Sequence, residues 1–502
     1  MTRAPLVVLG LDVGDPDQLA RWMDEGALPT LRSIVDRGAS GRLGGPEMLC
    51  EHAVWTSVFS GRSLGEHGYY YYRRLKPGTY DLQTITGVDI GAPPFWSRFA
   101  DGSRRCAIID APDYLPIDGI DGIQIADWAI HNAPFPARVE PATFAPAVRQ
   151  AGGDSTTIDE ALESDIDTDR RLFRRLMDRV RRKGAVCRAV LDRGRFDLVV
   201  AVFSDCHTAT HQFWKYRPDA GGPDTDLRHA TLQIYQAIDE ELATLLARCP
   251  EHANICVVGS TGMTDIYPMG DFIAPFCRLL GYQAEPLPEA PSLHPLAVAR
   301  RVMPEWLRVA ISKRFPRDVR ERLLSGQFRA ATDWSNTTAF GLPSAFTGFI
   351  RVNLQGREPQ GVVSAGAEYE ALLGRLEDDL WQLRDPQNGC GVVGAVARTA
   401  RIFGGVPTAL PDLMVEWASS RQFLQRLVHP RGEIRQAKPE FFRDSDHSRV
   451  GFFAAAGPAI ARGSLGTISP TDLAPLFLSL MGERFPLPAR RASSPSDLVE
   501  HR

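Results

Sequence analysis

Short apolar runs that end in an acidic residue or a glycine recur along the chain at intervals that leave room for helices. Four of them are PLVVLGLD (5–12), RCAIID (105–110), DLVVAVFSD (197–205) and NICVVG (254–259), and a later one is DLMVEW (412–417). Each has the length of one buried strand. Residues 159–191 and 226–246 have apolar positions at three- and four-residue spacing, which predicts helices. The alternation predicts an α/β fold in which helices cover both faces of a mostly parallel central sheet.

Residues 285–328 interrupt this pattern, because they are rich in Pro and Arg and contain one helical segment, PEWLRVAISKRF. We therefore expect a first part of the α/β core at 1–284, a cap or insertion at 285–328, a second part of the core at 329–490 and a loose tail at 491–502. The cap would cover the active-site end of the sheet. The alternative is a surface excursion with no part in the chemistry.

The amino-acid composition excludes several classes of protein. The 502 residues are 44% hydrophobic, enough for a sizeable core, and the net charge of −4 gives no sign of a nucleic-acid partner. No apolar segment is long enough to span a membrane, and the first residues do not read as a signal peptide. The eight cysteines have no paired spacing, which favours reduced thiols in a cytoplasmic protein. We expect a small-molecule substrate, and nothing here indicates the oligomeric state.

Candidate functional residues lie where the predicted strands end. Open α/β sheets bind ligands beyond the carboxyl ends of their strands. Asp12 ends the first run, and His207 and His211 follow a later one. On a helix, two histidines four residues apart share one face and can bind one metal ion, although paired histidines are also common on surfaces. Asp205 could orient one of these rings or cap the helix. Glu51 stands ahead of a helix-like segment, a position suited to phosphate binding.

Further segments add to this set in a fixed order. They are LPTLRSIVDRGASGRL (28–43), AVWTSVFSGRSLGEHG (53–68), NLQGREPQGVV (353–363), DLMVEW (412–417), DHSRVGFFAAAGPAI (446–460) and TDLAPLFLSLMG (471–482). Together with Asp12 at the first strand end, the ordered set resembles the alkaline-phosphatase superfamily, on its type I phosphodiesterase/nucleotide pyrophosphatase branch. The resemblance runs from about residue 5 to residue 485 and implies a two-metal α/β hydrolase.

Most of the positions at which this sequence differs from the family's motifs are ligands of one of the family's two metal ions. The family's Thr or Ser nucleophile falls on Glu51, and the Asp of its Asp-x3-His motif has become His207. Both ligands of its Ser-Asp-His-Gly-Met motif are absent at 259–263. The resemblance therefore implies one retained ion, held by His207, His211 and His447. Three imidazoles suit Zn²⁺, and also other divalent first-row metals. The second ion would keep Asp12, with Glu51 as a possible replacement ligand.

Three functional hypotheses follow. The first is a one-metal hydrolase of a phospho-ester, sulfo-ester or other ester-like small molecule, in which zinc lowers the pKa of a water molecule toward about 7. Glu51 and Asp12 are then the candidate catalytic residues, with Glu51 as general base or acid. The second is a transferase, lyase or bond-forming enzyme of specialised metabolism, because the clamp made by two metals is missing. The third is a non-catalytic protein of the same fold.

Overall fold

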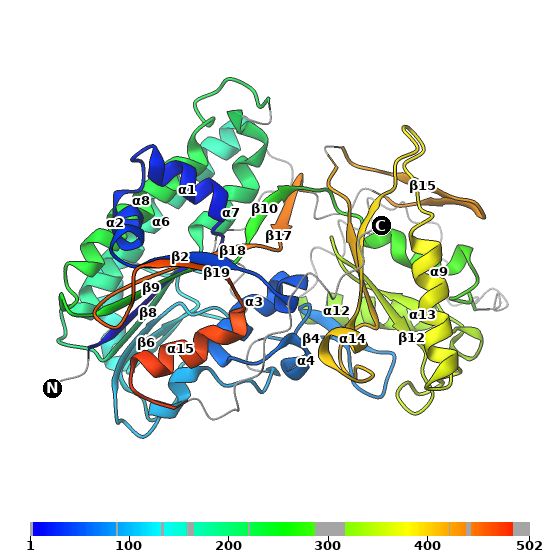
Figure 1. Cartoon of the computed structure of the whole chain (residues 1–502), viewed down its shortest axis with the longest axis horizontal. Coiled ribbons are helices and arrows are strands. Elements are labelled where there is room, and N and C mark those ends of the chain that lie inside the picture. Colours follow the sequence, from blue (N-terminus) through cyan, green and yellow to red (C-terminus); the bar gives the residue numbers. More distant parts are fainter. Residues whose placement is uncertain are drawn as a thin grey trace.

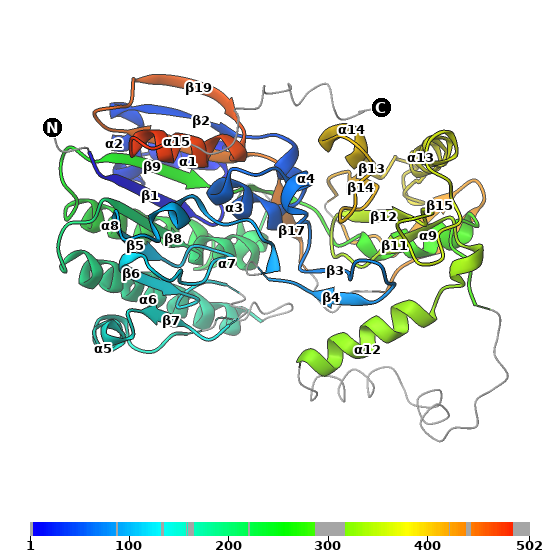
Figure 2. The same ribbon diagram turned by 90° about the horizontal axis from the view of Figure 1, so that it is seen from below.

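The computed structural model describes residues 4–86, 89–131, 135–156, 158, 165–218, 221–286, 317–420, 422–437 and 443–484. The predicted tail at 491–502 lies outside these residues. So does most of the predicted cap, including its helical segment PEWLRVAISKRF. The end of the predicted cap belongs to helix α12 (Arg317–Ala330), which packs against strand β4 (Leu82–Thr84) (Figure 2). An ion pair between Arg73 and Glu321 at 2.8 Å fixes this helix to the adjoining strand.

The core of the molecule is a nine-stranded sheet with the order β19-β2-β18-β9-β1-β8-β5-β6-β7 (Figure 1). Its strands are β1 (Leu6–Leu11), β2 (Ala39–Leu43), β5 (Arg105–Ile109), β6 (Asp121–Ala126), β7 (Arg138–Glu140), β8 (Leu198–Phe203), β9 (Asn254–Gly259), β18 (Gly451–Ala456) and β19 (Gly463–Ile468). The five strands from β9 to β6 run parallel to one another. The predicted mostly parallel α/β sheet is therefore confirmed.

Helices cover both faces of this sheet because residues along each strand point alternately to the two sides. Val7 and Leu9 of β1 pack with α1 (Pro16–Asp24), α2 (Pro29–Arg37), α5 (Ala145–Gly152), α6 (Ile166–Leu191), α7 (Asp205–Phe213) and α8 (Ala230–Leu246). Leu6 and Val8 pack on the other face with α3 (Glu51–Ser60) and α15 (Leu473–Leu480). The helices predicted at 159–191 and 226–246 correspond to α6 and α8.

A second, four-stranded antiparallel sheet lies beside the first (Figure 1). It has the order β11-β12-β14-β13, with β11 (Ala339–Leu342), β12 (Gly348–Val352), β13 (Val393–Arg398) and β14 (Leu413–Trp417). One face packs on α9 (Ile273–Leu279) and α13 (Ala367–Leu380), and the other on the start of α3 and on α4 (Leu64–His67). The strand predicted at 412–417 forms as β14, but in this sheet and not in the main one.

The remaining elements are short. Three two-stranded pairs are β3 (Arg73–Leu75) with β4, β10 (Gly262–Asp265) with β17 (Ser445–Ser448), and β15 (Arg426–His429) with β16 (Gly432–Arg435). Helix α14 (Thr399–Phe403) follows β13. The β10–β17 pair matters for the site because it brings together two segments far apart in the sequence, with Met263 opposite His447.

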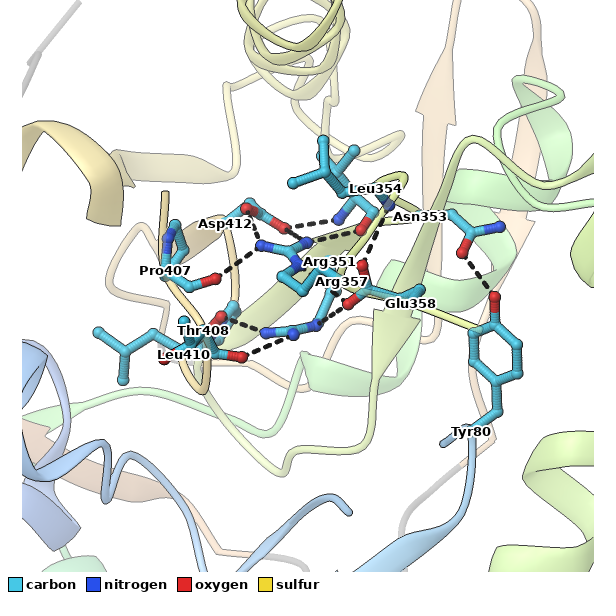
Figure 3. A network of polar contacts seen from close by, with 12 residues as sticks. Tyr80, Arg351, Asn353, Leu354, Arg357, Glu358, Pro407, Thr408, Leu410 and Asp412 are labelled. Atoms are coloured by element: carbon cyan, nitrogen blue, oxygen red, sulfur yellow. Dashed lines mark hydrogen bonds and ion pairs between the residues drawn. The ribbon is translucent and has the colours of Figure 1, made fainter. Parts of the chain in front are cut away.

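A buried polar network stabilises the four-stranded sheet (Figure 3). Arg357 donates to both oxygens of Asp412, at 2.9 and 2.7 Å, and to Glu358 at 2.9 Å. Arg351 donates to Glu358 at 2.7 Å and to the backbone oxygen of Leu410 at 2.6 Å. The segments 353–363 and 412–417, which resemble the family in sequence, thus join each other through charge-assisted hydrogen bonds.

Candidate metal centre

The parallel strands bring separate parts of the chain to one edge of the main sheet. Asp12 directly follows β1, while His207 and His211 lie on α7, which begins two residues after β8. His131 comes five residues after β6. Because these strands are parallel, their carboxyl ends meet at the same edge. All four side chains therefore belong to one site, and His447 joins them from β17.

His207, His211 and His447 form a compact cluster of three imidazole rings in this site. The ring centroids lie 4.8 Å apart for His207 and His211, 4.8 Å for His207 and His447, and 4.9 Å for His211 and His447. One nitrogen from each ring lies within 4.8 Å of the others, which suits three ligands of one ion. The structure thus brings together the three residues that we expected to hold a metal.

Two hydroxyl groups orient the rings of this cluster. The Nδ1 atom of His211 lies 3.1 Å from Ser445 Oγ, and the Nδ1 atom of His447 lies 2.9 Å from Thr261 Oγ1. The two Nε2 atoms then face each other at 3.3 Å. If both Nδ1 atoms carry the proton, two nitrogen lone pairs meet, an arrangement that a shared cation stabilises.

Electrostatics disfavours a proton as that shared cation. Burial lowers the pKa of His207 and of His211 well below the usual value, and the neighbouring imidazoles lower both further. Burial also lowers the pKa of His447, although Glu51 opposes the shift. Neutral imidazoles are the form that binds metals, so the chemistry of this donor set fits Zn²⁺.

We expect Thr261→Val and Ser445→Ala each to weaken zinc binding by about 10- to 100-fold, because each removes the partner that orients a histidine ligand. Ser448→Ala is the matched control: Ser448 lies on the same strand as Ser445, and its hydroxyl contacts the backbone oxygen of Val450 at 3.5 Å. Competition with a chromophoric chelator measures the affinities. Equal affinity in all three variants would contradict the orienting role of the hydroxyls.

Glu51 lies at the first turn of α3, beside the histidine cluster. Its Oε2 is 3.6 Å from His447 Nε2, and its Oε1 is 3.3 Å from His52 Nδ1. Burial acts to raise the pKa of Glu51, but the charges of His447 and His52 outweigh it and the pKa falls to about 2. Burial and the nearby Glu51 carboxylate raise the pKa of Asp446 well above its usual value. The two acids thus differ in their tendency to ionise.

Asp12 lies on the other side of His207. Its Oδ1 accepts a hydrogen bond from Trp55 Nε1 at 2.5 Å, and its Oδ2 lies 2.8 Å from His131 Nδ1 and 3.6 Å from His207 Nδ1. The rings of His131 and His207 stack with their centroids 3.8 Å apart. Sequence reasoning missed His131. The available signal was its position a few residues beyond the strand that we now assign as β6.

Other candidate residues have structural roles. Asp205 accepts a hydrogen bond from Arg179 Nε at 2.6 Å, with both side chains fully buried, and Ser204, not Asp205, stands at the N-cap of α7. The ion pair of Asp205 instead fixes the start of the helix that carries His207 and His211. Thr56 and Ser57 are completely buried, and Ser57 Oγ lies 3.0 Å from His67 Nε2. Neither residue lines the cleft beside Glu51 and His447, in keeping with the expectation that they have no catalytic role.

A cleft of about 200 Å³ opens beside Glu51 and His447. It lies between the main sheet and the four-stranded sheet, since its walls come from the start of α3, from β10 and β17, and from the end of β14. The walls include apolar side chains such as Trp417 and one ion pair, Arg449 with Glu416 at 2.5 Å. The cleft can hold a small molecule against the histidine cluster.

Comparison with known proteins identifies the family. A family model described as type I phosphodiesterase / nucleotide pyrophosphatase matches residues 6–281. No curated protein sequence matches the chain. Among solved structures, phosphonoacetate hydrolase from Sinorhizobium meliloti 1021, in complex with phosphonoformate, is similar at 15% identity and a TM-score of 0.49, over 96% of this chain and 95% of that one. Human ectonucleotide pyrophosphatase / phosphodiesterase 5 is similar at 12% identity and a TM-score of 0.48, over 99% of both chains.

No helix in the part of the chain that the structure describes is long and apolar enough to cross a lipid bilayer.

Proposed function

Because the chain belongs to the type I phosphodiesterase/nucleotide pyrophosphatase family, and so is an enzyme of the alkaline-phosphatase superfamily, we propose that it hydrolyses a phosphoryl or related ester of a small molecule. The ion that it needs would be bound by His207, His211 and His447. The observation that carries this proposal is the convergence of three imidazoles whose orientation is compatible with neutral ligands. A bound Zn²⁺ would supply a Lewis acid and lower the pKa of a water molecule.

The residues at the family's nucleophile position favour direct attack by water. Burial raises the pKa of the Cys50 thiol far above its usual value, so the thiol stays neutral and is a poor nucleophile. Its Sγ packs 3.6 Å from Met414 Sδ in the apolar contact between α3 and the second sheet. Glu51, its neighbour, is an ionised carboxylate that faces the cleft. We assign it to accept the proton of the attacking water.

The covalent phospho-enzyme of the family has no candidate residue at this position. Water attacks phosphorus, the ester bond breaks toward the leaving oxygen, and the proton of the water passes to Glu51. A single displacement of this kind inverts the configuration at phosphorus, whereas a covalent intermediate retains it.

The testing experiment combines metal analysis with a substrate screen. Metal content per chain is measured by inductively coupled plasma mass spectrometry on the wild type, on His211→Ala and on the exposed control His252→Ala. Hydrolysis of bis(4-nitrophenyl) phosphate, 4-nitrophenyl phosphate and 4-nitrophenyl sulfate is followed in the wild type with and without a chelator. We expect the wild type and the control to hold the same amount of zinc, His211→Ala to hold less, and at least one ester to be hydrolysed only in the metal-loaded protein.

Other outcomes separate the alternatives. A protein that holds its metal but hydrolyses none of these esters would favour the second hypothesis, in which the site performs a transfer, elimination or bond-forming reaction. A protein that binds no metal after purification without chelators would contradict the proposal and favour the non-catalytic interpretation.

A further inference from the structure

Two buried polar atoms beside the histidine cluster lack hydrogen bonds. Asp12 Oδ2 and His131 Nδ1 lie 2.8 Å apart as an ion pair, yet both atoms are buried without a hydrogen bond of regular geometry. Within the described part of the chain, neither atom has another hydrogen-bond partner. Buried polar groups are nearly always satisfied, so an unsatisfied pair calls for a missing partner.

A cation is the partner that fits this geometry. A carboxylate oxygen and an imidazole nitrogen that lie this close together, both buried, can bind one cation between them. His207 supplies a third donor, because its Nδ1 is 3.6 Å from Asp12 Oδ2 and its ring stacks on that of His131. One atom from each of the three residues lies within 4.8 Å of the others.

We propose that His131 is a metal ligand and that, with Asp12 and His207, it forms a second metal position beside the one described above. This inference rests on the proposed metal-dependent function and adds a residue that no motif of the chain indicates. An oxygen and two nitrogen ligands suit a divalent first-row metal such as Zn²⁺. The family resemblance implies that metal ligands are absent at 259–263, and His131 would supply a donor from a different loop.

His207 belongs to both groups, although a neutral imidazole has one lone pair. With both positions filled, His207 binds the second ion through Nδ1, which is the nitrogen close to Asp12. The first ion keeps His211 and His447. Asp446 can supply a further ligand, because one of its oxygens lies within 4.8 Å of a nitrogen of His447. Each position then retains three protein ligands.

The segment that presents His131 is anchored by a buried ion pair. Asp110, at the end of β5, accepts hydrogen bonds from the backbone nitrogens of Trp128 and Ala129, at 2.8 and 2.9 Å. Lys183 of α6 binds the same carboxylate at 2.8 Å, and both charged side chains are fully buried. His131 therefore follows a fixed stretch of backbone, as expected for a ligand held ready for its ion.

The test is the number of ions bound per chain at saturating Zn²⁺, after removal of free metal, in the full-length protein. We expect two ions in the wild type and in the control His252→Ala, and one ion in His131→Ala. His211→Ala removes a ligand of the first position, so this variant should also bind one ion, at the second position. Circular dichroism checks that each variant is folded.

Crystals of the zinc-loaded wild type give a second measurement that needs no variant. An anomalous difference map should contain two peaks, one of them about 2.0–2.1 Å from the Nδ1 atom of His131. One ion in the wild type that survives in His131→Ala, or two ions in both proteins, would overturn the assignment of His131. No ion in any protein would instead overturn the proposed function itself.

Discussion

Glu51→Gln is expected to lower kcat for the ester that the enzyme hydrolyses by about 10²- to 10⁴-fold, the range typical of a lost general base. The amide has nearly the same shape as the carboxylate but cannot accept a proton from water. The carboxylate lies 3.6 Å from His447 Nε2 and faces the cleft, so it is beside any water that an ion in the histidine cluster would hold. The measurement is steady-state turnover together with metal content.

The metal content of Glu51→Gln shows whether Glu51 acts as a general base or as a metal ligand. The three histidines remain in Glu51→Gln, so the variant should keep zinc at the cluster while it loses turnover. Glu47→Gln is the matched control, since Glu47 is a buried carboxylic acid four residues earlier that accepts a hydrogen bond from Ser469 at 3.1 Å. Wild-type turnover in Glu51→Gln would remove this residue from the mechanism, and loss of zinc would make it a ligand instead.

The strands of the main sheet could be predicted because each is marked by the residues of its own short segment. The runs at 5–12, 105–110, 197–205 and 254–259 are apolar between their ends, as strands buried on both faces must be, and each forms a strand of the nine-stranded sheet. The run at 412–417 has the same composition but pairs in the antiparallel sheet. An apolar run indicates that a strand is buried. Which strands it pairs with depends on contacts between residues that are distant in sequence.

The site shows the same division between local and distant information. His207 and His211 could be paired from their spacing, because four residues make about one turn of α7. The contribution of His447 was indicated only by family resemblance, since its position follows from the pairing of β17 with β10. His131 has no periodic neighbours and no motif. Its place in the site depends on the order of strands in the sheet and on the anchoring of its segment by Asp110, which a single sequence does not reveal.

The hydroxyls of Ser260 and Thr261 illustrate how a lost ligand can remain part of a site. In the sequence they mark the position where the resemblance implies missing metal ligands. In the structure Ser260 Oγ donates to the backbone oxygen of Asp12 at 2.7 Å, and Thr261 orients His447. Two hydroxyl groups at this position thus hold Asp12 and His447, both of which we propose as metal ligands.

Arg357→Met is expected to lower the free energy of unfolding by about 3–5 kcal/mol, the usual cost of removing one partner from a buried ion pair. Arg357 is the main cationic partner of Asp412, whose side chain is fully buried, and it also binds Glu358. Without it, the donors that remain for Asp412 among the described residues are neutral, such as the hydroxyl of Tyr369 at 2.7 Å. Urea unfolding measures the change.

Two further variants decide whether the buried charge is the cause. Arg357→Met combined with Asp412→Asn removes both charges and should recover part of the lost stability, since no ionised group then stays buried without a counter-ion. Arg32→Met removes an exposed arginine that pairs with Asp24 and Asp36, and it should leave stability nearly unchanged because solvent screens such pairs. If the double variant is no more stable than Arg357→Met alone, the loss comes from packing of the arginine side chain and not from the uncompensated charge.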